Sequence, residues 1–489
     1  MGSEMPGTGS DPMDDTILEL EMSGTPDGPA TPPEAKSAAA PPRAATGVFA
    51  KRVAGVLATR VTLFAIAFLT SVVLSRVLGP SGKGSYVAVV ALPGMLAALG
   101  MFGLPSAINY YAGKGASMRS LVRAVAIFTV ILSALMIAVV WFALPLLETS
   151  ILRAAPDNLL RVVLLTVPAG MLASFGGAIL YGRHAVKVYN LIQLWLAGVL
   201  FGLVVILVLV MRFGINGAVC GSVIYNLLTA VVVIAAVRRL GRTSPGGDPA
   251  TMPELLSYGA RCAPSLFAGY FNYRADTYVI QAEMSNYSYA LGQYSMAVTM
   301  DELIFYVPDS IATILLPRVA GATAEEANSW VGRVGRLTTL LSIGLALALI
   351  PAAYVGIHLI LPQFVDCLPA FLVLLPGAVS MSIAKVLGSY VGGRGRPGLM
   401  AAGMIAVLAI NIALNIVLVP RLGIVGASLA SFVSYTVQAA FAVFFASRVS
   451  GQRALSLFMP GRDELLLVAA TARRLLRRVA GAIKPGNRV

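Results

Sequence analysis

The sequence predicts an all-α polytopic membrane protein with about twelve transmembrane helices in two pseudo-symmetric six-helix bundles. Composition is the first observation, because 57% of the residues are hydrophobic, 12% are charged and the mean hydropathy is +0.82. Apolar runs of about twenty residues, the length that crosses a hydrocarbon core of ~30 Å, recur along nearly the whole chain. The third observation is an internal repeat with an offset of about 208 residues.

Matching residues in the two halves support the repeat. Gly84-Ser85-Tyr86 corresponds to Gly292-Gln293-Tyr294, and Pro168 corresponds to Pro376. Arg212-Phe-Gly-Ile-Asn-Gly-Ala218 returns as Arg421-Leu-Gly-Ile-Val-Gly-Ala427, and Ser222 and Ser431 follow in matching places. Duplicated membrane proteins commonly bind a substrate between their repeats, near the middle of the bilayer. The repeat therefore favours a transport function.

The spans follow in order from the apolar runs and the polar connections between them. They are expected at 53–75, 84–106, 120–147, 159–181, 186–210, 214–237, 254–281, 289–313, 333–360, 366–391, 398–420 and 423–447. This predicts an N-terminal six-helix bundle at 51–240, a cytoplasmic linker at 241–253 and a C-terminal six-helix bundle at 254–448.

Two tails flank the spans. Residues 1–50 are rich in Pro, Ala, Gly, Ser and Thr, so we expect a disordered tail that cannot bury enough apolar surface to fold. Residues 449–489 form a second tail, in which 462–484 has an apolar stripe beside basic residues such as Arg473 and Arg477. This pattern is typical of a surface helix that binds anionic lipid heads. It has no interleaved aromatic residues, which argues against nucleic-acid binding.

Basic residues predict the orientation, because Lys and Arg are retained on the cytoplasmic side of a membrane. They are enriched in alternate connections, for example at Arg183, Lys187 and Arg394, whereas the other connections hold few, among them Arg76 and Lys83. The asymmetry predicts that both termini are cytoplasmic.

Signatures of catalysis or of a cofactor are not found in the sequence, which has no Walker loop, dinucleotide glycine motif or nucleophile elbow. His184 and His358 are far apart, and Cys220, Cys262 and Cys367 have no paired spacing, so neither a metal site nor a disulfide is expected. The longest outer connection has only about a dozen residues, too few for a catalytic domain. The protein is therefore expected not to be an enzyme.

Ionisable residues inside the spans carry most of the functional information, since each costs a few kcal/mol in lipid and should face a cavity or a partner. The expected substrate-binding set is Arg60, Arg274, Asp276, Lys385, Asn109 and Asn272, and the expected ion-coupling set is Asp301, Glu302 and Asp309. Arginines suit a phosphate-bearing headgroup because the planar guanidinium binds two oxygens at once. For Arg60 and Lys385 snorkelling to lipid heads remains an alternative, as interhelical hydrogen bonding does for the asparagines.

Arg274 and Asp276 are two residues apart, so on a helix they do not face each other and each needs its own partner. They belong to a stretch, Asn272-Tyr-Arg-Ala-Asp276, that together with Leu291-Gly-Gln-Tyr-Ser-Met-Ala-Val298 and Leu316-Pro-Arg-Val-Ala320 resembles a known family. It is the polysaccharide transporter (Wzx-type) branch of the multidrug/oligosaccharidyl-lipid/polysaccharide (MOP) exporter superfamily. The likeness extends to the first half through Ser75-Arg-Val-Leu-Gly-Pro-Ser-Gly-Lys-Gly-Ser-Tyr86. The resemblance therefore covers roughly 50–450.

The resemblance implies two bundles in a V that open alternately to the two sides of the inner membrane of a bacterium. It also implies a polyprenyl-diphosphate-linked oligosaccharide as cargo, a proton or sodium ion as the coupling ion, and glycan polymerase or export machinery as candidate partners. The family's cavity cations match Arg60 and Arg274. Two alternatives stay open, a MATE-like multidrug exporter, which would need an acidic cavity, and a scaffold of an envelope glycan synthesis complex that transports nothing.

Overall fold

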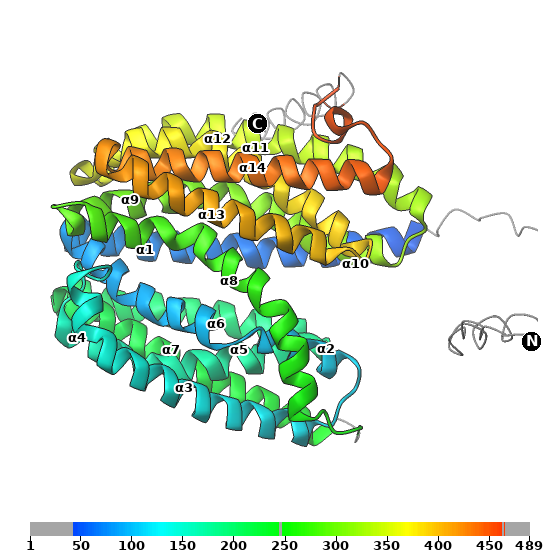
Figure 1. Cartoon of the computed structure of the whole chain (residues 1–489), viewed down its shortest axis with the longest axis horizontal. Coiled ribbons are helices and arrows are strands. Elements are labelled where there is room, and N and C mark those ends of the chain that lie inside the picture. Colours follow the sequence, from blue (N-terminus) through cyan, green and yellow to red (C-terminus); the bar gives the residue numbers. More distant parts are fainter. Residues whose placement is uncertain (1–42, 244–246, 462–463, 465–489) are drawn as a thin grey trace, which may run out of the picture. The chain divides into compact units, whose positions relative to one another are not determined.

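The computed structural model describes residues 43–243, 247–461 and 464. The chain divides into two compact units, Met1–Ala54 and Gly55–Val489, and the contacts given below lie within the second. The described residues contain helices and turns but no strand (Figure 1). The predicted basic helix at 462–484 lies outside them except for Glu464.

In the first half, α1 (Arg43–Gly100) begins inside the predicted N-terminal tail and runs through a kink at Gly79. The other elements are α2 (Leu104–Gly113), α3 (Met118–Thr149), α4 (Asp157–Val163), α5 (Thr166–Gly182), α6 (Val186–Val204) with a π-helical end at Val205–Val210, and α7 (Gly214–Thr243). α5 is the centre of this group, because α2, α3, α6 and α7 all pack against it.

The second half repeats this plan with α8 (Met252–Glu283), α9 (Tyr287–Asp301), a 3₁₀ turn at Glu302–Phe305, α10 (Tyr306–Ala320), α11 (Ala324–Ile360), α12 (Cys367–Gly393), α13 (Pro397–Leu422) and α14 (Ile424–Ser450). Here α12 is central and packs against α9, α10, α11 and α14. α5 and α12 carry the matched prolines Pro168 and Pro376, so the repeat found in the sequence places equivalent helices at the two centres.

Ten helices in the described part are long and apolar enough to cross a membrane. One of them, Thr62–Gly100, contains the kink and corresponds to two predicted spans, and the charged helix α8 is not among the ten. If Thr62–Gly100 is counted as two spans and α8 as one more, the helices account for the twelve expected spans. The all-α polytopic fold class is confirmed.

Small residues join the two halves at one end of the helices. A Cβ atom on Gly84 would lie 1.8 Å from the carbonyl oxygen of Ser288, and a Cβ atom on Gly292 would lie 1.8 Å from that of Pro80. Gly84 and Gly292 are equivalent in the repeat, and so are Pro80 and Ser288. The two contacts are therefore equivalent in the repeat, and only glycine permits an approach this close.

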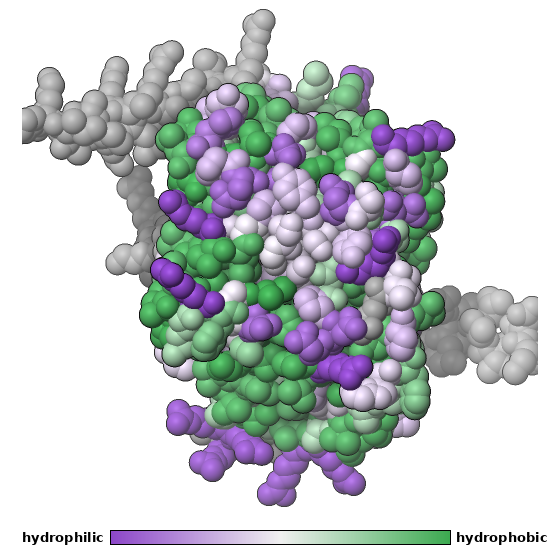
Figure 2. Space-filling model, turned by 90° about the vertical axis from the view of Figure 1, so that its left-hand side faces the viewer, coloured by the Kyte–Doolittle hydropathy of each residue, from purple (hydrophilic) through white to green (hydrophobic). Residues whose placement is uncertain are grey.

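Further contacts hold this end together. Arg153 of the α3–α4 connection donates to the backbone oxygen of Ala282 at 3.1 Å and stacks on Tyr287. Gln363 donates to the backbone oxygen of Ser75 at 3.4 Å. Hydrophilic residues gather across the middle of this end, and hydrophobic residues border them (Figure 2). We call it the Gly84 end.

Candidate functional site

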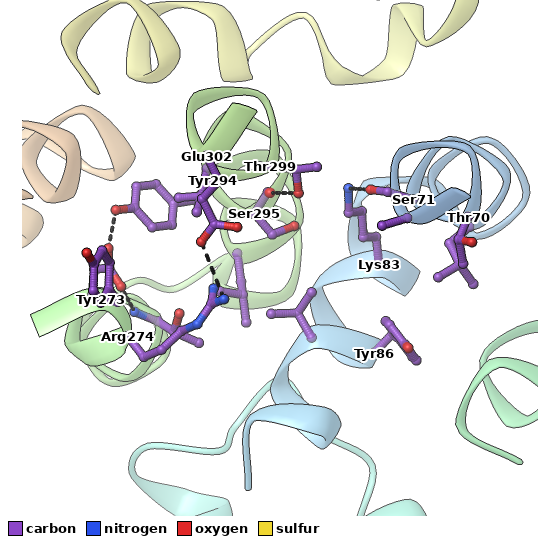
Figure 3. Close-up of a pocket in the computed structure, with 17 residues that line it drawn as sticks. Thr70, Ser71, Lys83, Tyr86, Tyr273, Arg274, Tyr294, Ser295, Thr299 and Glu302 are labelled. Carbon is purple, nitrogen blue, oxygen red and sulfur yellow. Dashed lines mark hydrogen bonds and ion pairs between the residues drawn. The ribbon is translucent and has the colours of Figure 1, made fainter. Parts of the chain in front are cut away.

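A pocket of about 220 Å³ lies where α1 of the first half meets α8 and α9 of the second. Its walls carry four charged residues, Lys83, Arg274, Asp276 and Glu302. In Figure 3 Arg274 and Glu302 lie on one side of this central pocket, and Lys83 and Ser71 lie on the other. The pocket thus lies between the repeats, where a duplicated transporter is expected to bind its substrate.

Arg274 and Glu302 form one wall. Arg274 Nη2 donates to Glu302 Oε1 at 3.4 Å, and the two side chains are 44% and 38% exposed. A pair with this much exposure contributes only ~0–1 kcal/mol to stability. The guanidinium therefore remains able to exchange its carboxylate partner for an anionic ligand.

Asp276 faces the interior of the second half and is only 4% exposed. The hydroxyl of Tyr294 donates to its Oδ2 atom, Ser431 donates to the same atom at 3.4 Å, and the backbone N–H of Thr277 donates to Oδ1 at 2.8 Å. Arg274 and Asp276, two residues apart, thus have separate partners, as the helical spacing requires.

The equivalent tyrosine and serine of the first half also meet. Tyr86 and Ser222 are hydrogen-bonded at 2.8 Å, and they correspond to Tyr294 and Ser431 in the repeat. In the second half the carboxylate of Asp276 accepts from both residues, whereas the matching position of the first half is Phe68.

Lys83 is the residue that the sequence prediction missed, because it was assigned to a connection between spans. The chain is instead helical on both sides of Gly79, whose φ of 66° turns α1 back without a loop. Lys83 is consequently 4% exposed, with Nζ 3.2 Å from Ser71 Oγ and 3.3 Å from Met296 Sδ. No ion pair to Lys83 is found in the described part of the chain. The sequence signal for this kink is the Gly79-Pro80 pair, which is compatible with a kinked helix as well as with a loop.

Two of the expected ion-coupling carboxylates, Asp301 and Asp309, have different surroundings. Asp301 is 2% exposed, and its Oδ1 atom has no hydrogen-bond partner among the described residues. Asp309 accepts from Lys385 Nζ at 2.7 Å, and the same ammonium lies over the ring of Phe305 at 4.8 Å. Asp309 and Lys385 are thus partners, and neither lines the central pocket.

The remaining predicted site residues are not in the central pocket. Asn272 is buried and donates to Gln438 of α14 at 2.9 Å, an interhelical contact of the structural kind. Asn109 lies exposed on α2. Arg60 lies in α1, and its side chain is outside the described part.

A second, larger cavity of about 590 Å³ opens from the first half. Ala67 and Thr70 of α1 line both cavities, so the two are neighbours along α1. The polar residues of its walls are Thr70, Tyr181, Tyr189, Asn190, Gln193, Tyr225, Tyr306 and Thr313, and no Asp, Glu, Lys, Arg or His is among the described residues that line it. We call it the side cavity.

Comparisons with known proteins agree with this arrangement. A family model described as "Polysaccharide biosynthesis protein" matches residues 73–368. No curated protein sequence matches the chain.

Three solved structures are similar at low sequence identity. The lipid II flippase MurJ in an inward closed conformation has a TM-score of 0.67 at 14% identity, covering 88% of this chain and 92% of its own. An inward-facing MATE multidrug transporter of the MOP superfamily has 0.61 at 14% identity, covering 81% and 98%. A MOP superfamily transporter from Pyrococcus furiosus with a binding pocket of reverse polarity has 0.61 at 14% identity, covering 82% and 95%. The fold is that of MOP superfamily transporters, and the resemblance found in the sequence is confirmed.

Proposed function

Because the chain belongs to the polysaccharide biosynthesis protein family, we propose that this multi-pass membrane transporter is a flippase for a polyprenyl-diphosphate-linked oligosaccharide. It would move that cargo across the cytoplasmic membrane of a bacterium for cell-surface or exopolysaccharide synthesis. The glycan head would cross through the cavities between the repeats, while the lipid tail stays in the bilayer. Glycan polymerase or export machinery is the proposed partner after translocation.

The observation that carries the proposal is the pair of cations on opposite walls of the central pocket. Arg274 comes from the second half and Lys83 from the first, and the pocket lies between them (Figure 3). A diphosphate has enough oxygens for both, with the arginine binding two and the lysine acting as a compact point charge. Such a ligand would bridge the halves, so its binding would be coupled to their movement.

The Gly84 end gives the proposal a direction. With both termini in the cytoplasm, this end would face the outside, and its glycine contacts hold the two halves together there. Separation of Gly84 from Ser288 and of Gly292 from Pro80 would open the outer side.

Asp301 is our choice for the coupling residue among Asp301, Glu302 and Asp309. Glu302 and Asp309 already have basic partners, whereas Asp301 is buried with an oxygen that no described residue satisfies. Buried intramembrane carboxyls of this kind are common in proton relays. Coupling to a proton rather than to sodium follows from this choice.

The test is depletion of the protein in its host, followed by mass spectrometry of polyprenyl-linked glycans and treatment of intact cells with a membrane-impermeant glycosidase. We expect the lipid-linked glycan to accumulate and to resist the glycosidase, because it remains on the cytoplasmic leaflet. An unchanged pool would refute the flippase and favour a multidrug exporter or a scaffold. Organic-cation efflux would identify the exporter, although the mixture of Lys83 and Arg274 with two acids in the pocket disfavours it.

A further inference from the structure

The side cavity has a composition that the diphosphate does not explain. It is larger than the central pocket, about 590 Å³ against 220 Å³, and lies in the range of roughly 300–1,000 Å³ typical of small-molecule sites. Four tyrosines and two amides, Tyr181, Tyr189, Tyr225, Tyr306, Asn190 and Gln193, contribute to its walls. Among the described residues that line the two cavities, all the charged ones thus line the central pocket.

Gln193 and three of the tyrosines contact one another or a neighbouring ring. Gln193 Nε2 donates to the hydroxyl of Tyr189 at 2.6 Å, one helical turn earlier on α6. The rings of Tyr181 and Tyr189 are 4.8 Å apart at a tilt of 52°. Across the cavity, the ring of Tyr306 lies 4.9 Å from Phe64 of α1. The walls therefore present ordered rings and, at Gln193, an oriented amide.

This combination matches the chemistry of sugars. A pyranose ring has an apolar C–H face, which packs on an aromatic ring, and a rim of hydroxyls that both donate and accept. Asparagine and glutamine carry a donor and an acceptor on one group, so they satisfy such a rim without a net charge.

Other ligands fit the side cavity less well. An organic cation would lose its hydration there without an acid to pair with among the described residues, and an anionic group would lose its hydration without a base among them. A lipid chain has a better surface nearby, a groove of about 240 Å³ with apolar walls that include Phe64, Phe68, Met300 and Leu349.

We propose that the side cavity binds uncharged sugar residues of the lipid-linked glycan, next to the diphosphate in the central pocket. This inference rests on the proposed function and adds a substrate class to it, a glycan whose first sugars beyond the diphosphate are neutral. Ala67 and Thr70, which line both cavities, would lie between the diphosphate and the sugars.

Binding measurements on the full-length protein in lipid nanodiscs test the proposal. The two probes are bare polyprenyl diphosphate and the lipid-linked glycan pool extracted from the depleted host. We expect Gln193→Leu and Asn190→Leu each to weaken binding of the glycan-bearing lipid about tenfold, equivalent to ~1.4 kcal/mol, and to leave binding of the bare carrier unchanged. Arg274→Ala should weaken both.

Asn226→Leu is the matched control, because Asn226 lies on α7 next to Tyr225 but does not line the side cavity. If Gln193→Leu fails to insert, Tyr189→Phe replaces it, since this variant removes only the hydroxyl that Gln193 contacts. Equal loss for both probes, or no loss beyond that of Asn226→Leu, overturns the sugar assignment while the flippase stands. Failure of the wild-type protein to bind either probe overturns the flippase itself.

Chemical analysis of the same pool gives an independent check. We expect the sugars nearest the reducing end, released by mild acid, to pass through an anion-exchange column unretained. Retention caused by a uronic acid or another acidic substituent on these sugars would contradict the proposal.

Discussion

Arg274 illustrates how a charged residue can be essential without being important for stability. Its pair with Glu302 is partly exposed and worth only ~0–1 kcal/mol. We expect Arg274→Ala to abolish surface glycan at unchanged protein abundance, as measured by a glycan-specific stain and by immunoblotting of membranes. Glu302→Gln is the control and should retain export, because it leaves the guanidinium in the pocket. Normal surface glycan in Arg274→Ala would refute the assigned role.

Lys83 differs because it is buried without a carboxylate partner in the described chain. A desolvated, unpaired ammonium is costly, so Lys83→Met, which keeps most of the volume, should leave the melting temperature equal or higher. Transport of the lipid-linked glycan should nevertheless fall at least tenfold, whereas Lys83→Arg should keep part of it. A large drop in melting temperature for Lys83→Met would show that the lysine has a structural role instead.

These two residues show what the sequence could and could not predict at this scale. Arg274 and Asp276, which line the central pocket, could be singled out because charge inside an apolar span is conspicuous, and their spacing correctly required separate partners. Lys83 was missed because hydropathy cannot distinguish a kinked helix from a loop at Gly79-Pro80. The partners of Asp309 and Asn272, Lys385 and Gln438, lie 76 and 166 residues away along the chain and depend on tertiary packing.

At the scale of elements, the helix crossing at the Gly84 end is the most sensitive point. A methyl group on Gly292 would meet the backbone of Pro80, which has no side chain that could move aside. We expect Gly292→Ala to hold this end open and to reduce glycan export, whereas Gly202→Ala, with nothing within 4 Å of the added atom, should export normally.

Labelling reports the opening directly. In a background without the three native cysteines, Ser71→Cys beside Lys83 should react with a membrane-impermeant maleimide added to intact cells only when Gly292→Ala is also present. Equal labelling with and without Gly292→Ala would rule out the crossing as the closure of this end.

The segment after α14 is a second element with a specific attachment. Arg336 of α11 donates to Glu464 at 2.7 Å and to the backbone oxygen of Ser456 at 2.8 Å. The hydrogen bond from Arg336 lowers the pKa of the Glu464 carboxyl below its usual value near 4.5.

A lowered pKa in the folded protein means that this contact stabilises the attached segment above pH ~4.5 and is lost as the pH falls through the lowered value. We expect limited proteolysis after Ser450 to accelerate below pH ~4 in the wild-type protein. Glu464→Gln should be cleaved at the faster rate at pH 7 as well. Equal rates for the two proteins at pH 7 would show that the ion pair does not hold the segment.

For the whole molecule, the repeat predicted much of the architecture. α5 and α12 are central in their groups, and the matched turns at Gly214 and Gly423 both have positive φ, 57° and 60°. The sequence could not show that the described residues with charge line one cavity and that those of the other are uncharged. Helices α1, α6, α7 and α10 all contribute to the side cavity, and no periodicity links them.

Orientation in the membrane is also a property of the whole chain and remains a prediction from the basic residues. We expect a green fluorescent protein fused to the C-terminus to fluoresce and alkaline phosphatase at the same position to be inactive, because both report a cytoplasmic location. An active phosphatase fusion would reverse the assignment, and the Gly84 end would then face the cytoplasm.

The reciprocal contact of Gly84 and Gly292 has a consequence for the origin of the chain. Each glycine lies against the carbonyl oxygen of the residue four positions before the equivalent glycine of the other half. One position of the repeat therefore supplies the glycine on both sides of the crossing. A half-length ancestor that paired with a second copy of itself around a two-fold axis would have needed only one such glycine. After gene fusion each glycine became separately mutable, and loss of either one would damage the junction that both had inherited.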